Sequence, residues 1–362
     1  MKIVCCVNHS WPHVGGSEKV VQQIAESAAN DFSHDVVVLS RSLEKSLSHN
    51  NVQYIPCAPN DEAFLSQLQK LKPDHTHVYS DCFAHWGSLL HGCEKISGTK
   101  SIALVGMNHM RESERTMMVF LRKKDQFKVI THSDIYLDYQ KCHSKGVDIS
   151  VIPNGVDLQE FDQNTLDFNT KGKKVVLCVS NFFPGKGQEH LVKALDLVSL
   201  NRNDFRAVFV YSSTNFMFGQ ILERQVKRLL DAAKFESDFI KNMPREKVVA
   251  AFKHASVFAF PSQKEVAPLV ALESQAARTP WVALPVGNIR DLKGGIVIPH
   301  AGLDVRGYAR YSNDVYHNMA MAINDLLDEK EYDNLVLNGR KQVEESYCWS
   351  QIGKLYNEVF TS

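Results

Sequence analysis

The most informative stretch of the chain is residues 261–273, PSQKEVAPLVALE. The apolar run 257–260 before it, VFAF, predicts a short buried strand. Pro268 suits the first turn of a helix because its ring fixes φ at a helical value. Helical spacing from there places Leu269 and Leu272 on one side, where they would face a sheet. The stretch therefore predicts a strand, a loop and a helix in succession, the repeating unit of an α/β fold.

Two carboxylates bracket the turn in this stretch, Glu265 in the loop and Glu273 inside the helix. A helix N-terminus that follows a strand binds phosphate, because its free backbone N–H groups and the helix dipole converge there. The two carboxylates would repel a phosphate, so we expect them to contact neutral hydroxyl groups on either side of it. A phosphate flanked by hydroxyl-rich groups describes a nucleotide sugar.

The length and net charge of the chain indicate how many domains it forms and which kinds of partner it binds. The 362 residues are more than one core usually needs and fit two domains. Lys+Arg and Asp+Glu number 41 each, so no net charge attracts nucleic acid, and we expect no nucleic-acid partner. The first seven residues form too short an apolar run for a signal peptide and predict a strand, and no run is long enough to span a membrane.

The cysteines and carboxylates lack the spacing of a disulfide framework or a metal site. The eight cysteines include no Cys-x-x-Cys pair, and several lie in strand-like runs, which favours a reduced, cytoplasmic protein with buried thiols. No Asp-x-Asp triplet occurs, and no histidine or cysteine group has metal-ligand spacing. We therefore expect a site that uses no metal ion.

Short apolar strands alternate with helical stretches through both halves of the chain, which predicts two doubly wound parallel sheets. A polar segment, residues 157–174, separates the halves and is the expected linker. Such sheets bind ligands beyond the carboxyl ends of their strands. The expected strands are 3–7, 36–40, 77–79, 101–105, 128–131, 150–152, 175–180, 206–211, 239–241, 257–260, 281–284 and 295–298. The expected helices are 19–30, 62–71, 86–96, 187–200, 220–233, 244–254, 268–277 and 351–360.

Five segments together resemble one known family. The spacing of Glu265 and Glu273 resembles the Glu-x7-Glu signature of retaining glycosyltransferases of the GT-B fold, in particular glycosyltransferase family 4. Four other segments resemble elements of the same family and occur in the family's order. Residues 15–20 (GGSEKV) resemble the glycine loop after its first strand, and residues 151–157 (VIPNGVD) resemble its interdomain element. Residues 179–187 (VSNFFPGKG) resemble the segment that opens its second domain, and residues 347–350 (YCWS) resemble an aromatic element before its last helix.

The resemblance implies an α/β protein of the GT-B class, with two doubly wound Rossmann-like domains that face a central cleft. Residues 1–160 would form the N-terminal acceptor-binding domain and residues 161–345 the C-terminal nucleotide-sugar-binding domain. Residues 346–362 would form a helix that returns to the N-terminal domain. The implied activity is retaining, metal-independent transfer of a hexosyl group from a UDP- or GDP-linked sugar to an acceptor hydroxyl, with no other cofactor. This would serve the synthesis of a polysaccharide or another glycoconjugate.

The resemblance also implies roles for residues around the 261–273 stretch. Glu265 would hold sugar hydroxyls near the reacting carbon, and Glu273 would bind the ribose hydroxyls of the nucleotide. The ammonium of Lys186 would neutralise charge on the departing diphosphate. Asn181 stands where the family usually has an arginine, and asparagine supplies no charge, so Lys264 is a second candidate cation. Backbone N–H groups of Ala267, Leu269 and Val270 would cradle the diphosphate.

The N-terminal half supplies the remaining candidates. Gly15 and Gly16 would let the backbone approach the diphosphate or the acceptor. His109 matches the family's cleft histidine and would contact the donor sugar as a catalytic residue. His85 and Arg111 would contact the acceptor, which is a glycan, a lipid-linked sugar or a small molecule.

Residues 117–124, apolar and then basic, are compatible with a buried helix or with peripheral contact at the inner face of a membrane.

Two other functional classes remain open. A nucleotide-sugar epimerase would bind the same donor without an acceptor. A catalytically weak glycan-binding or scaffold protein would keep the fold without turnover, and Asn181 is the feature that favours it.

Overall fold

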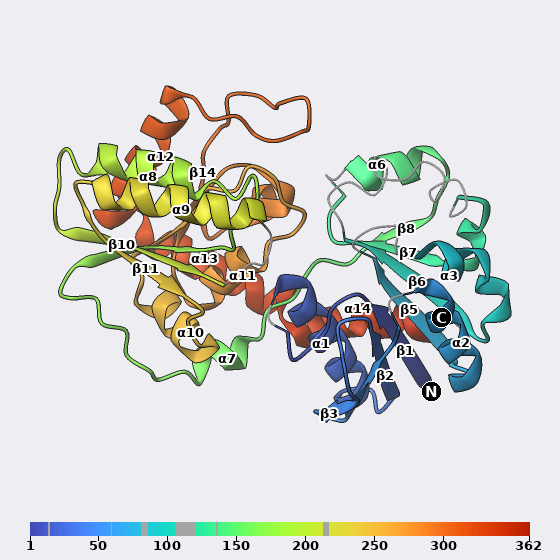
Figure 1. Ribbon diagram of the computed structural model, residues 1–362. Helices are drawn as coiled ribbons and strands as arrows, with labels where there is room; N and C mark the ends of the chain where they lie inside the picture. Colours follow the sequence, from blue (N-terminus) through green and yellow to red (C-terminus); the bar gives the residue numbers. More distant parts are fainter. Residues whose placement is uncertain (14, 59, 81–85, 106–120, 135–136, 213–216) are drawn as a thin grey trace. The chain divides into compact units, whose positions relative to one another are not determined.

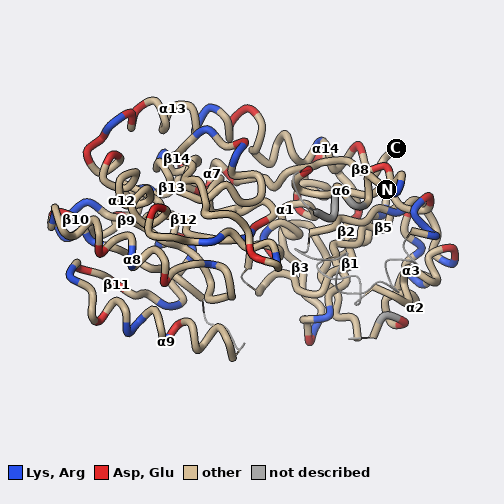
Figure 2. The backbone as a smooth tube through the Cα atoms, turned by 90° about the horizontal axis from the view of Figure 1, so that it is seen from above, with Lys and Arg blue, Asp and Glu red and all other residues tan. Residues whose placement is uncertain are grey.

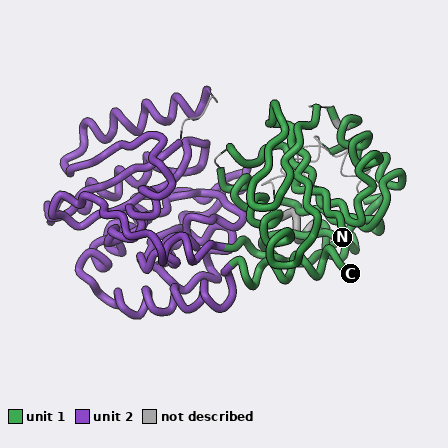
Figure 3. Tube along the Cα trace, turned by 90° about the horizontal axis from the view of Figure 1, so that it is seen from below, with its two compact units in different colours: residues 1–155, 349–362 green, residues 156–348 purple. Residues whose placement is uncertain are grey.

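The computed structural model describes residues 1–13, 15–58, 60–80, 86–105, 121–134, 137–212 and 217–362 (Figure 1). The chain forms two compact units, which Figure 3 distinguishes by colour. Unit 1 comprises residues 1–155 and 349–362, and unit 2 comprises residues 156–348. The sequence prediction placed the domain boundaries at 160/161 and 345/346, whereas the two compact units divide at 155/156 and 348/349. The cleft expected between the two domains stays a prediction.

Unit 1 is built on an eight-stranded sheet with the strand order β3-β4-β2-β1-β5-β6-β7-β8. Its neighbouring strands are parallel, except that β3 and β4 pair antiparallel. The central strands are buried on both faces, which is why they read as nearly continuous apolar runs. The strands are β1 (Lys2–Val7), β2 (Asp35–Ser40), β3 (Leu47–His49), β4 (Val52–Pro56), β5 (His75–Ser80), β6 (Thr99–Leu104), β7 (Lys128–Thr131) and β8 (Ile149–Val151).

Helices cover both faces of this sheet. Helices α1 and α14 pack together, and α2 packs with α3 (Figure 1). The contact between α1 and α14 is close at Gly353, where an added Cβ would lie 2.1 Å from the Ser27 Oγ. The C-terminal segment is therefore part of unit 1. The helical elements are α1 (Gly16–Asn30), α2 (Asp61–Leu71), α3 (Gly87–His91), η2 (Cys93–Lys95), η3 (Lys124–Gln126), α6 (Leu137–Ser144) and α14 (Trp349–Thr361).

Unit 2 is built on a six-stranded, fully parallel sheet with the order β11-β10-β9-β12-β13-β14. The order reverses beside β9, because β10 lies on one side of it and β12 on the other. The crevice at such a reversal, beyond the carboxyl ends of the strands, is where doubly wound sheets bind ligands. The strands are β9 (Lys174–Val179), β10 (Phe205–Tyr211), β11 (Glu236–Lys241), β12 (Val257–Phe260), β13 (Trp281–Ala283) and β14 (Gly295–Val297).

Two helical layers enclose the second sheet. Helices α8, α9 and α12 lie on one face, and α10, α11 and α13 lie on the other (Figure 1). The buried sheet residues and the apolar sides of these helices form one continuous core. The helical elements are α7 (Leu158–Asp162), α8 (Gln188–Val198), α9 (Met217–Ala232), α10 (Arg245–His254), α11 (Leu269–Ala276), η4 (Gly287–Asp291), α12 (Asn313–Leu327), α13 (Tyr332–Gln342) and the π-helical turn η5 (Val343–Tyr347).

The structure confirms two doubly wound α/β sheets and every predicted strand, with ends shifted by at most a few residues. The sequence analysis missed β3, β4, α6, α7, α12 and α13. The predicted linker at residues 157–174 is wrong, because this segment belongs to unit 2. Phe161 in α7 is buried and Phe168 packs against the same core, so the polar residues around them do not make the segment a free connection.

Lysines and arginines are interspersed with aspartates and glutamates along the backbone of both units (Figure 2). This distribution matches the equal numbers of basic and acidic residues in the sequence. Among the described residues, no helix has both the length and the apolar character that crossing a bilayer requires.

Candidate functional site

The candidate residues of unit 2 gather at the carboxyl ends of three neighbouring strands. Strand β9 pairs with β10 on one side and with β12 on the other, so the loops that follow these strands meet at one edge of the sheet. The loop after β9 carries Asn181 and Lys186, and the loop after β12 carries Lys264 and Glu265. Helix α11 begins directly after the second loop, with Pro268 as its extended N-cap residue.

Lys186 and Glu265 form an ion pair at this edge. The Lys186 Nζ lies 2.6 Å from the Glu265 Oε1, although the two residues are 79 positions apart in the sequence. The Ser262 Oγ donates a second hydrogen bond of 2.6 Å to the same oxygen. The Glu265 side chain is 10% exposed, and its Oε2 makes no hydrogen bond to a described residue. The site thus offers one cation and one carboxylate oxygen next to a helix N-terminus.

Two glycines allow the loops to approach closely enough for this pair to form. Gly185 and Gly187 adopt positive φ values of 87° and 74°, which favour glycine. A Cβ on Gly187 would lie 2.2 Å from the main-chain oxygen of Pro261, so any side chain there would push the two loops apart. The main-chain N–H of Gln263 donates to the Gly185 oxygen at 2.7 Å and joins the loops. This backbone contact fixes Lys186 opposite Glu265.

Asn181 and Lys264 make contacts of a different kind. The Asn181 Oδ1 accepts a hydrogen bond of 3.0 Å from the main-chain N–H of Ser212, which follows β10. The Lys264 Nζ donates to the main-chain oxygen of Arg306 at 3.1 Å and lies 5.1 Å from the centre of the Tyr308 ring. Both residues therefore belong to the loops that carry the ion pair.

The N-terminal turn of α11 supplies backbone donors beside the pair. The first N–H groups of a helix have no partner inside it, and Leu269 and Val270 open this helix half-buried. Ala267 and Val266, just before the helix, are buried. The main-chain oxygen of Val266 accepts from the Asn288 N–H at 3.0 Å, which anchors the loop. The predicted succession of strand, loop and helix is thus present, and phosphate binding at this helix N-terminus stays a prediction.

Glu273 lies one turn further into α11 and is 8% exposed. Its Oε1 lies 2.7 Å from the Nη2 of Arg245, the first residue of α10. Arg245 in turn holds the carboxylate of Glu160 in α7 with two hydrogen bonds of 2.8 Å. Burial disfavours the guanidinium charge, but the attraction of Glu273 and the bonds to Glu160 outweigh it and raise the pKa of Arg245.

Sequence reasoning missed both Arg245 and Glu160. They are 85 positions apart, and they meet only because α7 packs against α10. No spacing or motif in the sequence marks such a pair in advance.

The candidates in unit 1 are only partly described. Gly15 precedes α1 as its extended N-cap residue and Gly16 opens the helix, beyond the carboxyl end of β1. The carboxylate of Glu18 turns back toward Gly15, where an added Cβ would lie 2.2 Å from its Oε2. His85, His109 and Arg111 lie outside the described residues.

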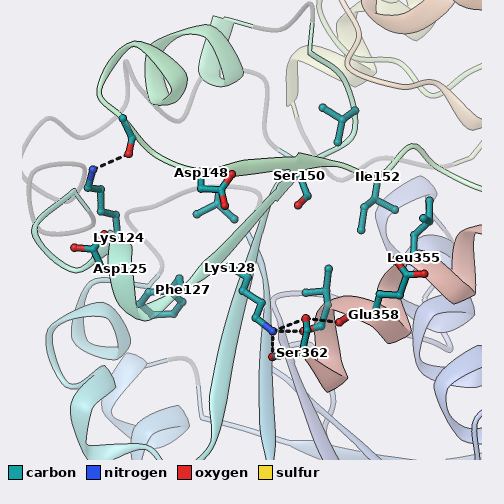
Figure 4. A pocket seen from close by; sticks show the side chains of 14 residues that line it. Lys124, Asp125, Phe127, Lys128, Asp148, Ser150, Ile152, Leu355, Glu358 and Ser362 are labelled. Atoms are coloured by element: carbon teal, nitrogen blue, oxygen red, sulfur yellow. Dashed lines mark hydrogen bonds between the residues drawn. The ribbon is translucent and has the colours of Figure 1, made fainter.

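A cavity of about 770 Å³ in unit 1 contains none of the predicted site residues (Figure 4). It lies at the amino end of β7, between β8 and the end of α14, and not at the carboxyl edge of the sheet. The Lys128 ammonium donates to the main-chain oxygen of Val359 and to the Ser362 Oγ, both at 2.9 Å. Lys128 therefore supplies hydrogen-bond donors to the last turn of α14, whose carbonyls have no partner inside the helix. The residues that line this cavity anchor the end of that helix to the sheet.

Comparison with known proteins agrees with this geometry. A mannosyltransferase of Corynebacterium glutamicum, named GDP-mannose-dependent monoacylated alpha-(1-6)-phosphatidylinositol monomannoside mannosyltransferase, is 25% identical over 227 residues. That alignment covers 58% of this chain and 55% of the relative, so the chain spans about half the relative's length.

Solved structures match over the whole chain. Sucrose-phosphate synthase from Thermosynechococcus elongatus has a TM-score of 0.77 at 19% identity and covers 99% of both chains. Anabaena HepE in complex with UDP has a TM-score of 0.75 at 16% identity and covers 100% of both chains. These likenesses establish the fold, which is GT-B. The model of the family described as "Glycosyl transferases group 1" matches residues 160–342, half of the 362-residue chain. The matched region contains the six-stranded sheet, the loops that carry Lys186 and Glu265, and helix α11 with Glu273. The chain therefore belongs to the glycosyl transferases group 1 family.

Proposed function

We propose that this protein transfers a hexosyl group from a nucleoside diphosphate sugar to an acceptor hydroxyl, with retention of configuration and without a metal ion. The observation that carries the proposal is the meeting of Lys186 and Glu265, 2.6 Å apart, beside the N-terminus of α11. The name of the corynebacterial relative specifies GDP-mannose, and HepE was solved with UDP. Both support a UDP- or GDP-linked donor. The absence of an Asp-x-Asp triplet from the sequence favours a reaction without a metal ion.

In this reaction Lys186 stabilises the departing diphosphate. The bond between the anomeric carbon and the phosphate oxygen breaks while the acceptor oxygen bonds to the same face of that carbon. Negative charge then builds on the diphosphate, and the Lys186 ammonium and the backbone N–H groups of Ala267, Leu269 and Val270 stabilise it. The diphosphate oxygen takes the acceptor proton, so the mechanism needs no separate general base.

The carboxylates recognise the neutral parts of the donor. Glu265 holds sugar hydroxyls, and its Oε2, which makes no hydrogen bond to a described residue, is the oxygen available for them. The ammonium of Lys186 has three protons and so is able to donate to Glu265 and to a phosphate together. Glu273 binds the ribose hydroxyls. Lys264 is a further donor-site cation once it leaves the Arg306 carbonyl, and Asn181 shapes the loop beside it.

Unit 2 binds the donor and unit 1 binds the acceptor in this proposal. Gly15 and Gly16 allow close approach of backbone to substrate at the carboxyl edge of the first sheet. His109 contacts the donor sugar, as the resemblance to family 4 implies. His85 and Arg111 contact the acceptor.

The acceptor is a glycan, a small molecule or a lipid-linked sugar, and the corynebacterial relative's name describes a lipid acceptor. A lipid-linked acceptor would require peripheral contact with a membrane surface. The apolar first half of the segment predicted for this contact, residues 117–120, lies outside the described residues, whereas its basic second half, residues 121–124, lies within them. Flotation with vesicles that contain anionic lipid tests the contact, and protein that stays at the bottom of the gradient would exclude it.

An assay of donor turnover tests the proposed function. The protein is incubated with UDP- and GDP-linked sugars, and both nucleoside diphosphate release and the identity of the sugar are followed. Slow release into water, accelerated by an acceptor, is the expected result. A changed sugar without release would identify an epimerase and overturn the proposal.

A catalytically weak binding protein is the second candidate, and Asn181 favours it. Its side-chain oxygen is engaged with the Ser212 N–H, so this position presents no positive charge to a diphosphate. Tight binding of a nucleotide sugar without release of the diphosphate for any acceptor would support this reading.

A further inference from the structure

Arg245 lies between two carboxylates that come from different parts of the chain. Its Nη2 is 2.7 Å from the Glu273 Oε1, and its Nε and Nη2 each bond one oxygen of Glu160 at 2.8 Å. The guanidinium also lies 5.7 Å from the centre of the Phe161 ring. The two bonds to Glu160 use a planar fork that fixes the plane of the guanidinium. Arg245 therefore reaches Glu273 in a fixed orientation.

Glu273 keeps one carboxylate oxygen available. Its Oε1 is held by Arg245, whereas its Oε2 makes no hydrogen bond to a described residue. The side chain is 11% exposed, and Arg245 is the charged partner that a carboxylate this buried needs. An oriented carboxylate with one unused oxygen is well suited to accept hydrogen bonds from a pair of adjacent hydroxyls.

We propose that Arg245 is the positioning residue for ribose recognition, because it holds the Oε1 of Glu273 and turns its Oε2 toward the ribose hydroxyls. This inference rests on the proposed function, in which Glu273 binds the ribose of the donor. Glu160 acts one step further out, by fixing the guanidinium that orients Glu273. The three side chains carry a net negative charge of one, which suits neutral hydroxyls and disfavours direct contact with the diphosphate.

The test removes the ligand hydroxyls and the arginine separately and together. Titration calorimetry measures the affinity of UDP and GDP and of their 2′,3′-dideoxy forms for the wild-type protein and for Arg245→Met, Arg245→Lys and Glu160→Gln. For the nucleotide that binds, loss of the hydroxyls is expected to weaken wild-type binding about 10- to 100-fold, the range for hydrogen bonds to a charged group.

In Arg245→Met the same ligand change is expected to matter little, about threefold or less, because the misplaced Glu273 no longer accepts the bonds. Arg245→Lys keeps the charge without the fork and is expected to retain part of the discrimination, and Glu160→Gln should retain more. Arg202→Met is the matched control, because Arg202 also bonds two carboxylates, Asp204 and Asp328, but lies at the amino edge of the same sheet. It should leave the discrimination at its wild-type value.

Two results would overturn the inference. Equal weakening of the ribose and dideoxy ligands by Arg245→Met would mean that Arg245 only stabilises the fold. Tighter binding of the ribose ligand by this variant would mean that the guanidinium blocks the pocket. If Arg245→Met does not fold, Arg245→Lys and Glu160→Gln provide the test. The same ratio of ribose-ligand to dideoxy-ligand affinity is measured, and its graded loss in these two variants decides. Wild-type protein that binds neither UDP nor GDP would overturn the proposed function and this inference with it.

Discussion

The side-chain oxygen of Asn181 accepts a hydrogen bond of 3.0 Å from the main-chain N–H of Ser212. Because β9 and β10 are paired neighbours, this bond joins the loops that follow both strands. The main-chain oxygen of Asn181 also accepts from the Gln188 Nε2 at 3.1 Å, which links the loop to the start of α8. Asn181 thus braces the loop that carries Lys186, at the position where the resembled family usually has a charged arginine.

Replacing Asn181 by arginine is expected to weaken nucleoside diphosphate binding, by about tenfold if one brace is lost. The Ser212 N–H would lose its acceptor, and the longer side chain would lie next to the buried Phe182. Titration with UDP and GDP measures the change, and Asn203→Arg, an exposed site in the same unit, controls for added charge. A gain in both donor affinity and turnover would show instead that the missing charge is the only consequence of asparagine here.

Lys186→Ala is expected to weaken nucleoside diphosphate binding by tenfold or more while it changes binding of the bare nucleoside little. The ammonium is the cation that the structure holds beside the α11 N-terminus, so only ligands with phosphate should lose its contact. Calorimetric titration measures the ratio of wild-type to variant affinity for the nucleoside diphosphate and for the bare nucleoside. Lys227→Ala on the exposed side of α9 is the control. Equal losses for the two ligands would place Lys186 away from the phosphates.

The strands were predictable because buried parallel strands are nearly continuous apolar runs, as in β9 and β12. Strand β3 was not predicted, because Leu47–His49 has only three residues and lies at the sheet edge. Helix α12 carried a readable signal that was overlooked, since Ser312 caps it and Val315, Met319 and Ile323 recur with helical spacing.

The candidate site was predictable where a motif fixes it and not where packing does. Glu265 and Lys186 belong to segments with family spacing, and the structure brings them into contact. The pair of Arg245 and Glu160 beside Glu273 was not predictable, because Glu160 lies in a segment whose polarity predicted a linker. Its helix, α7, packs into the core of unit 2 through Phe161, a contact that depends on the completed core. Tertiary ion pairs of this kind leave no local pattern in the sequence.

Glu265→Gln is expected to lower donor turnover about a hundredfold while it leaves nucleoside diphosphate affinity unchanged or slightly higher. The amide keeps the shape of the side chain but removes the charge that holds sugar hydroxyls, and it releases Lys186 for the phosphates. Turnover is followed by diphosphate release, and Glu246→Gln on the surface of the same unit is the control. Wild-type turnover in Glu265→Gln would remove Glu265 from the proposed mechanism.

Unit 1 is expected to lose stability in acid because it buries three neutral histidines. Burial, together with the neighbouring charges of His77, Lys128 and Lys100, lowers the pKa of His75 to about 3. Burial and His132 lower the pKa of His77 to about 3, and burial lowers that of His132 to about 4 despite a bond to the Ile152 oxygen. Each histidine titrates near pH 6.5 in the unfolded chain, so the unfolded state binds more protons between that pH and the folded value.

The stability that these histidines support is therefore complete above about pH 7.5 and falls as the pH drops through 6.5, by about 2 kcal/mol for each histidine at pH 5. Hydrogen exchange, expressed as protection factors at pH 7.5 and pH 5, is expected to show a large loss in β5, β6 and β7. Unit 2 is the internal reference, since His190 is the only histidine among its described residues whose pKa is lowered to this extent. His77→Gln should reduce the loss in unit 1 by about one third, because one of the three titrating groups is gone. Equal loss of protection in both units, unaffected by that variant, would mean that other groups control the acid response.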